Sequence, residues 1–281
     1  MNLKEHTVAI CSIVRNARRG LVRNAPVIRS LCAHFKDYRV VIFENDSTDG
    51  TDRFLEEWAE KDPKVYVSCR RIGVRTIPRP EDVSCNPFFS IWRNEKMSGF
   101  RNQYLAYVES QGWNPDFLVV VDLDVAKLNL DGILTSFTDT VEWDAVTSFG
   151  YSLSPKLSRR YHDTYAFVEY GCEDIPQTEE SIVSASYRYA KVKPTDPWIR
   201  VFSAFGGLAI YRYPCIRGLR YKAIENADPR VASRAEHYSL YAQMKERGFD
   251  RVYVNPAMTL KYQRLSARII WNHIKRSIDL Q

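Results

Sequence analysis

Two hydrophobic patterns alternate along the first 126 residues of the chain. Apolar residues recur at helical spacing in three segments, 17–35, 47–62 and 91–113. Short continuous apolar runs lie between these segments and predict strands covered on both faces, at 6–14, 38–46, 64–69 and 116–125. Strands that alternate with helices favour a parallel, doubly wound sheet, whose ligands bind at the carboxyl ends of the strands.

The pattern is less regular after residue 126. Apolar runs and helical spacing predict further elements, namely strands at 143–152, 198–213 and 251–256 and helices at 233–249 and 265–280. The segment 151–200 is rich in Tyr, Ser and charge and has weak periodicity, so we expect a long excursion over the binding site. Because no internal repeat or linker is recognisable, a single domain over 1–281 is the simplest interpretation.

The composition is typical of an ordinary globular protein, with 45% hydrophobic and 26% charged residues. The balance of 40 Lys and Arg against 34 Asp and Glu gives a net charge of +6, which argues against a nucleic-acid partner but suits a pocket that receives phosphates. The six cysteines form no C-x-x-C pair, and we expect them to be reduced.

No apolar run near the first residue has the length of a signal peptide or membrane anchor, and none elsewhere approaches the roughly 18 apolar residues of a spanning helix. We therefore expect a cytoplasmic protein, in the host cytoplasm if the gene is viral. Peripheral contact with a membrane stays open, because Ile269, Ile270, Ile274 and Ile278 form an apolar side of the last predicted helix. Packing of this side onto the domain is the alternative.

One acidic pair directly follows a buried strand. The apolar run 118–121 leads into Asp122, Leu123 and Asp124. Residues two apart on a strand point the same way, so both carboxylates can converge on one ion, and such oxygen ligands suit Mg²⁺ or Mn²⁺ completed by substrate phosphates. The plain alternative is helix capping or solvation in a loop. We favour the metal site, because a second acidic cluster, 44–46, ends another strand at the same expected edge of the sheet.

Two other classes of protein fit the same pair. Phosphohydrolases of the haloacid-dehalogenase type carry D-x-D after an apolar strand, and Asp122 would then be the nucleophile. In those enzymes the motif normally opens the fold, whereas three predicted strands precede it here, and the chain has no Asp-Asp pair. A non-catalytic module that binds a sugar or nucleotide is the second alternative.

Several motifs in order carry a family resemblance. These are "VVIFENDSTDGT" at 40–51, "RNEKMSGFRNQYL" at 93–105, "VVVDLDV" at 119–125, "FGGLAIYR" at 205–212 and "EHYSLYAQMKERGFDRVYVNP" at 236–256. Together they resemble the nucleotide-sugar glycosyltransferases of the GT-A fold and are most similar to the capsule-associated, cryptococcal-type alpha-1,3-mannosyltransferase family. The resemblance covers roughly residues 7–258.

The resemblance implies a GT-A-like, Rossmann-related, mostly parallel central sheet flanked by helices, with an irregular acceptor-side half. Residues 1–126 would bind the nucleotide-sugar and 127–281 the acceptor, including the C-terminal helix. The implied activity is metal-dependent transfer of one sugar from a nucleoside diphosphate sugar to a glycan hydroxyl, with Mn²⁺ or Mg²⁺ as cofactor. GDP-mannose is the favoured donor, and a UDP-sugar such as UDP-xylose stays open.

The resemblance also implies roles for residues on the donor side. The end of the first strand, including Ile13 and Val14, would line the nucleotide pocket. Glu44 and Asp46 would lie near the base and ribose, and Arg101 would face the diphosphate together with Asp122 and Leu123, because a guanidinium pairs well with phosphate. Asn102 would accompany Arg101, although the dipeptide Arg93-Asn94 is an alternative match to the same motif.

On the acceptor side, Glu236 would act with Asp124 in catalysis, either as general base or as an acid that orients the acceptor. His237 would be a third metal ligand, with His273 as another candidate and a structural histidine as the plain alternative. Gly206, Gly207 and Trp198 would contact the acceptor. Phe202 and Phe205 are further aromatic residues that suit sugar faces, although core packing explains all three rings equally well.

Overall fold

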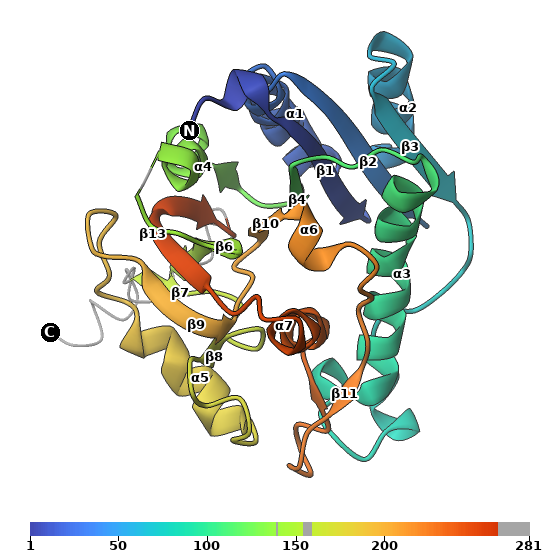
Figure 1. The fold of residues 1–281 in the computed structure, drawn as a ribbon. Helices are drawn as coiled ribbons and strands as arrows, with labels where there is room; N and C mark the ends of the chain where they lie inside the picture. Colours follow the sequence, from blue (N-terminus) through green and yellow to red (C-terminus); the bar gives the residue numbers. More distant parts are fainter. Residues whose placement is uncertain (139, 154–158, 264–281) are drawn as a thin grey trace, which may run out of the picture.

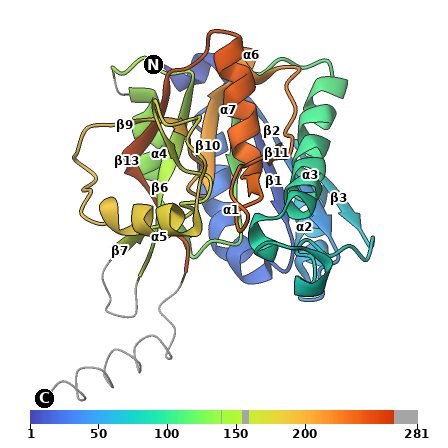
Figure 2. The ribbon, with the colours of Figure 1, turned by 90° about the horizontal axis from the view of Figure 1, so that it is seen from below.

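The structure, a computed structural model, describes residues 1–138, 140–153 and 159–263. These residues form a layered fold in which helices cover both faces of one large sheet (Figure 1; Figure 2). The strand order is β3-β2-β1-β4-β10-β6-β13-β9-β8, with β5 beside β13 and β7 beside β6. The predicted α/β class, with a helix-flanked central sheet, is therefore confirmed.

The first half of the chain forms the parallel part of this sheet. Its strands are β1 (Thr7–Val14), β2 (Asp37–Asn45), β3 (Val65–Arg70) and β4 (Phe117–Val121). Strand β1 pairs in parallel with β2 and β4, and β2 pairs with β3. The helices of this half are α1 (Arg18–Cys32), α2 (Thr51–Lys61) and α3 (Ile91–Ser110), and its 3-10 turns are η1 (Leu3–Glu5), η2 (Pro80–Asp82) and η3 (Pro87–Phe89).

The second half continues the same sheet with mixed pairing. Its main strands are β6 (Ala145–Leu153), β9 (Ile199–Ser203), β10 (Leu208–Arg212) and β13 (Val252–Lys261). Strand β10 lies antiparallel between β4 and β6, while β6 and β13 are parallel. Short strands complete the sheet, namely β5 (Lys127–Leu128), β7 (Arg159–Tyr161) and β8 (Val168–Glu169), and β11 (Ile224–Glu225) pairs separately with β12 (Ser233–Arg234). The helices are α4 (Leu130–Thr138), α5 (Glu179–Arg188), α6 (Tyr213–Ile216) and α7 (Glu236–Glu246).

Strand β1 divides the apolar core into two layers. Val8 and Ile10 belong to the cluster formed with α1, α2 and α4, whereas Ala9 and Cys11 belong to the cluster formed with α3, α6 and α7. Successive side chains of a strand point to opposite faces, so a strand covered on both sides is apolar at every position. This burial explains the continuous apolar runs in the sequence.

Two of the differences from the expected elements have local causes. Helix α2 begins at Thr51 rather than at residue 47, because Asp49 accepts hydrogen bonds from the backbone N–H and hydroxyl of Thr51 in the turn before it. The segment 151–200 is more regular than expected, since it contains β7, β8 and α5. Helix α5 has a Thr178–Ser181 capping box but buries only Ile182, and one apolar residue gives no visible period.

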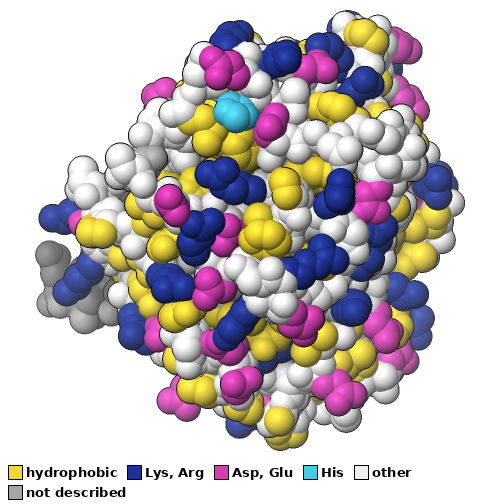
Figure 3. Space-filling model, viewed as in Figure 1, with side chains coloured by type: hydrophobic (Ala, Val, Ile, Leu, Met, Phe, Trp, Pro, Cys, Tyr) yellow, Lys and Arg dark blue, Asp and Glu magenta, His cyan; other side chains and the backbone are white. Residues whose placement is uncertain are grey.

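The last predicted helix, 265–280, lies outside the described residues, as does His273. Among the helices that are described, none combines the length and apolar character needed to cross a bilayer. On the face drawn in Figure 3, basic and acidic side chains are interspersed, in keeping with the modest net charge.

Candidate active site

A cavity of about 380 Å³ opens at the carboxyl ends of β1, β2 and β4. This is the edge at which an α/β sheet normally binds its ligands. Side chains from both halves of the chain line it, namely Ile13, Val14, Arg15, Asn45, Thr76, Arg93, Met97, Phe100, Arg101, Asp122, Asp124, Asp163, Tyr165, Ala166, Phe205, Ala235, Glu236, His237 and Tyr262. The cavity thus lies at the edge of the sheet where the sequence predicted the site.

The D-x-D motif lies in a turn rather than on the strand. Strand β4 ends at Val121, and the N–H of Asp122 donates to the carbonyl of Gly207 at 2.8 Å. Asp122 and Asp124 both line the cavity, as expected, but the turn brings them there and not the two-residue period of a strand. The side chain of Leu123 between them is buried in the core, so this predicted donor-binding residue does not line the cavity.

Helix α1 packs against this turn and donates hydrogen bonds to it. The side-chain amide of Asn24 donates to the carbonyls of Leu123 and Val125, at 3.0 and 2.9 Å. Gly20 approaches so closely that a Cβ atom there would lie 2.3 Å from the carbonyl oxygen of Leu123 and 2.5 Å from Cα of Asp124. The position of the motif thus depends on two residues about 100 positions earlier in the chain.

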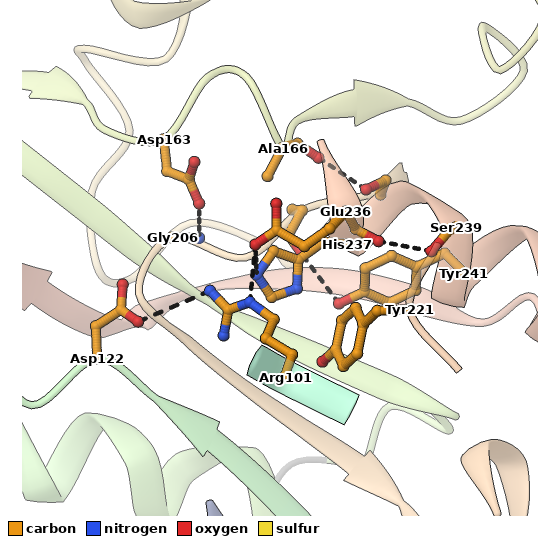
Figure 4. A network of polar contacts seen from close by, with 12 residues as sticks. Arg101, Asp122, Asp163, Ala166, Gly206, Tyr221, Glu236, His237, Ser239 and Tyr241 are labelled. Carbon is orange, nitrogen blue, oxygen red and sulfur yellow. Dashed lines mark hydrogen bonds and ion pairs between the residues drawn. The ribbon is translucent and has the colours of Figure 1, made fainter. Parts of the chain in front are cut away.

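A buried ion pair forms the floor of the cavity. Nε of Arg101 donates to Oε1 of Glu236 at 2.8 Å, and both side chains are at least 93% buried (Figure 4). Nη2 of the same guanidinium lies 4.0 Å from Oδ1 of Asp122, and its face lies over the ring of Phe205. Burial alone would raise the pKa of Glu236, but neighbouring positive charge, that of Arg101 first, lowers it to about 2, so Glu236 stays ionised.

Asp122 has an environment that disfavours its negative charge. Burial raises the pKa of Asp122 to about 7, an effect that Arg101 and the hydroxyl of Tyr262 reduce and Asp124 increases. The Tyr262 hydroxyl donates to Oδ2 of Asp122 at 2.8 Å. Loss of hydration also raises the pKa of Asp124, which lies at the exposed rim. Two carboxylates of this kind would be stabilised by a cation, and the donor set is that of a hard divalent ion.

His237 lines the same cavity as a neutral imidazole ring, which can accept a hydrogen bond. Its ring is 2% exposed, stacks on Phe205 at 4.0 Å and meets Tyr221 edge-on. Burial, then the nearby Arg101, lowers the pKa of His237 well below its usual value, so the ring is neutral, and neither nitrogen has a hydrogen-bond partner among the described residues. Within the same part of the chain, no three His, Cys, Asp or Glu side chains form a closed metal cluster. Metal ligation by His237 therefore stays a prediction.

Asp163 is a cavity residue that sequence reasoning missed. It has a left-handed backbone, with φ of 65°, and its Oδ2 accepts from the N–H of Gly206 at 3.2 Å (Figure 4). Burial, with Asp122 and Glu236 nearby, raises the pKa of Asp163 to about 7. Its local sequence, in the aperiodic stretch after β7, contains no signal that could have identified it, whereas a strained aspartate in a cavity is a common feature of functional sites.

The acidic cluster after β2 is placed differently from the expectation. Oε1 of Glu44 accepts from the N–H of Ser47 at 2.7 Å. Glu44 lines a smaller cavity, which shares Asn45 and Phe100 with the main one. Both oxygens of Asp46 accept hydrogen bonds from the backbone N–H groups of residues 72–74. The side-chain amide of Asn45 and then these N–H groups lower the pKa of Asp46 to about 2. Asn45, between them, is the residue that lines the cavity. These two carboxylates hold loops in this structure.

Both copies of the duplicate motif on α3 bring their arginine to the cavity. Arg93, Met97, Phe100 and Arg101 lie on one face of the helix and line the cavity. The predicted partner Asn102 is turned away, since its amide exchanges two hydrogen bonds with the backbone of Tyr221.

None of the three predicted acceptor-binding residues, Gly206, Gly207 and Trp198, is among the residues that line the cavity. Gly206 and Gly207 form the left-handed turn between β9 and β10, where a Cβ at Gly206 would lie 2.2 Å from the carbonyl oxygen of Ser148. Phe205, before this turn, lines the cavity. Trp198 does not; it packs edge-on against Tyr253, beside the core cluster that contains Val8 and Ile10. Phe202 also lies outside the cavity, packed on Tyr238.

Comparison with known proteins shows similarity only among solved structures. No family model matches the sequence, and no curated protein does. A mannosyltransferase from Pyrobaculum calidifontis, PcManGT, solved with GDP-Man and Mn²⁺, is 14% identical with a TM-score of 0.49, over 98% of this chain and 65% of that one. Residues 1–349 of TarS from S. aureus give 13% identity and 0.45, over 92% and 60%. Glucosyl-3-phosphoglycerate synthase from Mycobacterium tuberculosis gives 12% and 0.44, over 97% and 76%. This chain thus spans less than two thirds of the length of the first two.

Proposed function

We propose that this chain is a metal-dependent glycosyltransferase that moves one sugar from a nucleoside diphosphate sugar to a glycan hydroxyl. The observation that carries the proposal is the convergence of Asp122 and Asp124 with the buried Arg101–Glu236 pair in one cavity at the carboxyl edge of the sheet. The motif resemblance supports the same activity, because its separate segments supply these four residues.

On the donor side, Asp122 and Asp124 would hold Mn²⁺ or Mg²⁺, which would neutralise the charge that grows on the departing diphosphate. Arg101 is held by Glu236 and cannot lose its proton, so it adds a fixed positive charge beside Asp122. Ile13, Val14 and Asn45 form the wall on which a nucleotide would lie. GDP-mannose remains the favoured donor by resemblance, with UDP-xylose as the alternative.

On the acceptor side, we assign different roles to two carboxylates. Glu236 is a weak base, because its pKa is about 2 and Arg101 occupies one of its oxygens; it orients the guanidinium. Asp163 is the better proton acceptor for an attacking hydroxyl, since its pKa of about 7 lies near neutral pH and the Gly206 N–H engages only one of its oxygens. His237 and Phe205 would contact the transferred or accepting sugar.

The proposal is tested by thermal shift with GDP, UDP and their sugars, with and without Mn²⁺, followed by an assay of donor hydrolysis and transfer. We expect stabilisation by one nucleotide only when Mn²⁺ is present, and loss of this effect in Asp124→Asn. Turnover of simple phosphate esters without an acceptor, through an aspartyl-phosphate on Asp122, would establish the phosphohydrolase instead. Saturable binding without turnover of any donor would establish a binding module.

A further inference from the structure

A second cavity, of about 220 Å³, lies behind the wall of the first. The two cavities share two stretches of chain whose successive residues face opposite ways. Thr164 and Phe167 line the second cavity, whereas Tyr165 and Ala166 line the first. In the same manner Arg234 faces the second cavity and its neighbours Ala235 and Glu236 face the first. The wall is thus one chain thick, and it carries the acceptor-side residues of the proposed active site.

Arg234 brings an unpaired positive charge to this second cavity. Its side chain is 5% exposed and lies over the ring of Tyr238. Nη2 donates to the carbonyls of Glu173 and Ile175, but Nη1 has no hydrogen-bond partner and no carboxylate lies within ion-pair distance among the described residues. Burial lowers the pKa of Arg234, with only longer-range compensation from groups such as Asp174. A buried cation without a counter-ion is unfavourable unless an anion from outside the chain completes it.

The other polar groups of this cavity do not supply that anion. Glu169 is already neutralised, because it accepts from Arg188 and from the hydroxyl of Tyr189. Gln177 is 8% exposed and donates its amide to the carbonyls of Tyr165 and Phe167, which leaves its Oε1 without a partner among the described residues. Among the buried side-chain atoms of the described residues that line this cavity, Nη1 of Arg234 and Oε1 of Gln177 have no hydrogen-bond partner. A cationic donor beside a neutral acceptor fits an anionic group next to a hydroxyl.

We propose that this cavity is a subsite for a negatively charged sugar, one that carries a carboxylate or a phosphate monoester, in the acceptor glycan. Arg234 would pair with the anionic group, and Oε1 of Gln177 would accept from a neighbouring sugar hydroxyl. That the bound sugar belongs to the acceptor glycan rests on the proposed function. The binding of a charged sugar is argued from the cavity alone.

The test is isothermal titration of the whole chain with D-glucuronate, D-glucose 6-phosphate and D-glucose. We expect one of the two anionic sugars to bind at least about tenfold more tightly than D-glucose, since a charge-assisted pair distinguishes them. The two anionic probes show whether the group is a carboxylate or a phosphate. Equal affinity for all three sugars, or no binding of either anionic sugar, would overturn the proposal.

Two substitutions on α5 localise the binding. Ala185→Trp fills the cavity from its lining, and we expect it to weaken anionic-sugar binding at least about tenfold. Val183→Trp is the matched control, because Val183 is 60% exposed on the same helix, and it should bind like the unaltered chain. Arg234→Gln should lose the preference for an anion; if it does not fold, Ala185→Trp alone decides. Unchanged affinity in Ala185→Trp would refute the subsite.

The same samples separate this proposal from the proposed function. Nucleotide and Mn²⁺ are added to each variant, and the thermal shift is recorded. If nucleotide stabilises Ala185→Trp as it does the unaltered chain while anionic-sugar binding is lost, both proposals stand. If anionic sugars bind but no nucleotide does, the subsite stands and glycosyl transfer fails; the reverse result rejects the subsite alone.

Discussion

Gly20→Ala is a sensitive test of the site because it acts on the D-x-D turn without touching the cavity. Its Cβ atom would lie 2.3 Å from the Leu123 carbonyl oxygen and 2.5 Å from Cα of Asp124, and both are backbone atoms that no rotamer change can move. Contacts under 3.0 Å are essentially never observed. The turn must therefore move away from α1 by roughly 0.7 Å or more, because the interior is close-packed.

The magnitude follows from two opposing contributions. Overpacking of this kind costs about 1–3 kcal/mol, while alanine in place of glycine inside α1 returns about 1 kcal/mol of helix propensity. We therefore expect a net loss of roughly 0–2 kcal/mol in the free energy of unfolding, which leaves the chain folded. Mn²⁺-dependent nucleotide binding should fall at least about tenfold, because Asp124 moves relative to Asp122.

Urea denaturation and titration with nucleotide and Mn²⁺ measure both quantities. Gly99→Ala is the matched control: Gly99 is also helical, is exposed, and has nothing within 4 Å of the added Cβ. It should gain about 0.5–1 kcal/mol and bind normally. Asn24→Ala removes two hydrogen bonds to the same turn without a clash and should weaken binding in the same direction. A folded Gly20→Ala protein with unaltered Mn²⁺-dependent binding would refute the assignment of this turn as the metal site.

Three further substitutions probe the charges around the cavity. Arg101→Met leaves Glu236 buried and unpaired, so the chain should lose about 3–5 kcal/mol of unfolding free energy at pH 7, and less in acid, where Glu236 takes up a proton; a change below 1 kcal/mol would contradict the buried pair. Tyr262→Phe removes a hydrogen-bond donor that favours ionised Asp122, so the pKa of Asp122 should rise. Mn²⁺-dependent binding should then weaken about three- to tenfold at pH 6.5 but not at pH 8.5. An equal effect at both pH values would argue against this cause. Asp163 loses its proton as the pH rises through about 7, so the kcat of transfer should rise over that range. Asp163→Asn should have a low kcat that does not rise with pH. An unchanged pH profile in this variant would exclude Asp163 as the proton acceptor.

The sequence predicted the elements well where the signal is local, and the cavity lies at the sheet edge that it indicated. The strands β1, β2 and β4 are buried on both faces, so their apolar runs are visible without any partner. Asp122 and Asp124 followed from their place at the end of such a run. Helix α5 was missed for the opposite reason, since it buries only Ile182 and its capping box alone does not distinguish a helix from a turn.

The contacts of individual side chains could not be predicted in this way. Asp46 looked free at a strand end, but the backbone of residues 72–74 occupies both its oxygens. Trp198 looked suited to a sugar, but it packs against Tyr253 and does not line the cavity. Each outcome depends on which distant segment packs beside the residue, and no local pattern records that.

By itself, the sequence determined the strands and helices that bury an apolar face, and that two acids follow a buried strand, because the local period of apolar residues reflects burial and secondary structure. Only the tertiary structure decided that Glu236, 135 residues away, pairs with Arg101, and that Asp163 enters the cavity through a left-handed turn. The physical reason is that the charge state of a carboxylate depends on its desolvation and its nearest charges, and both are set by contacts between segments far apart in the chain.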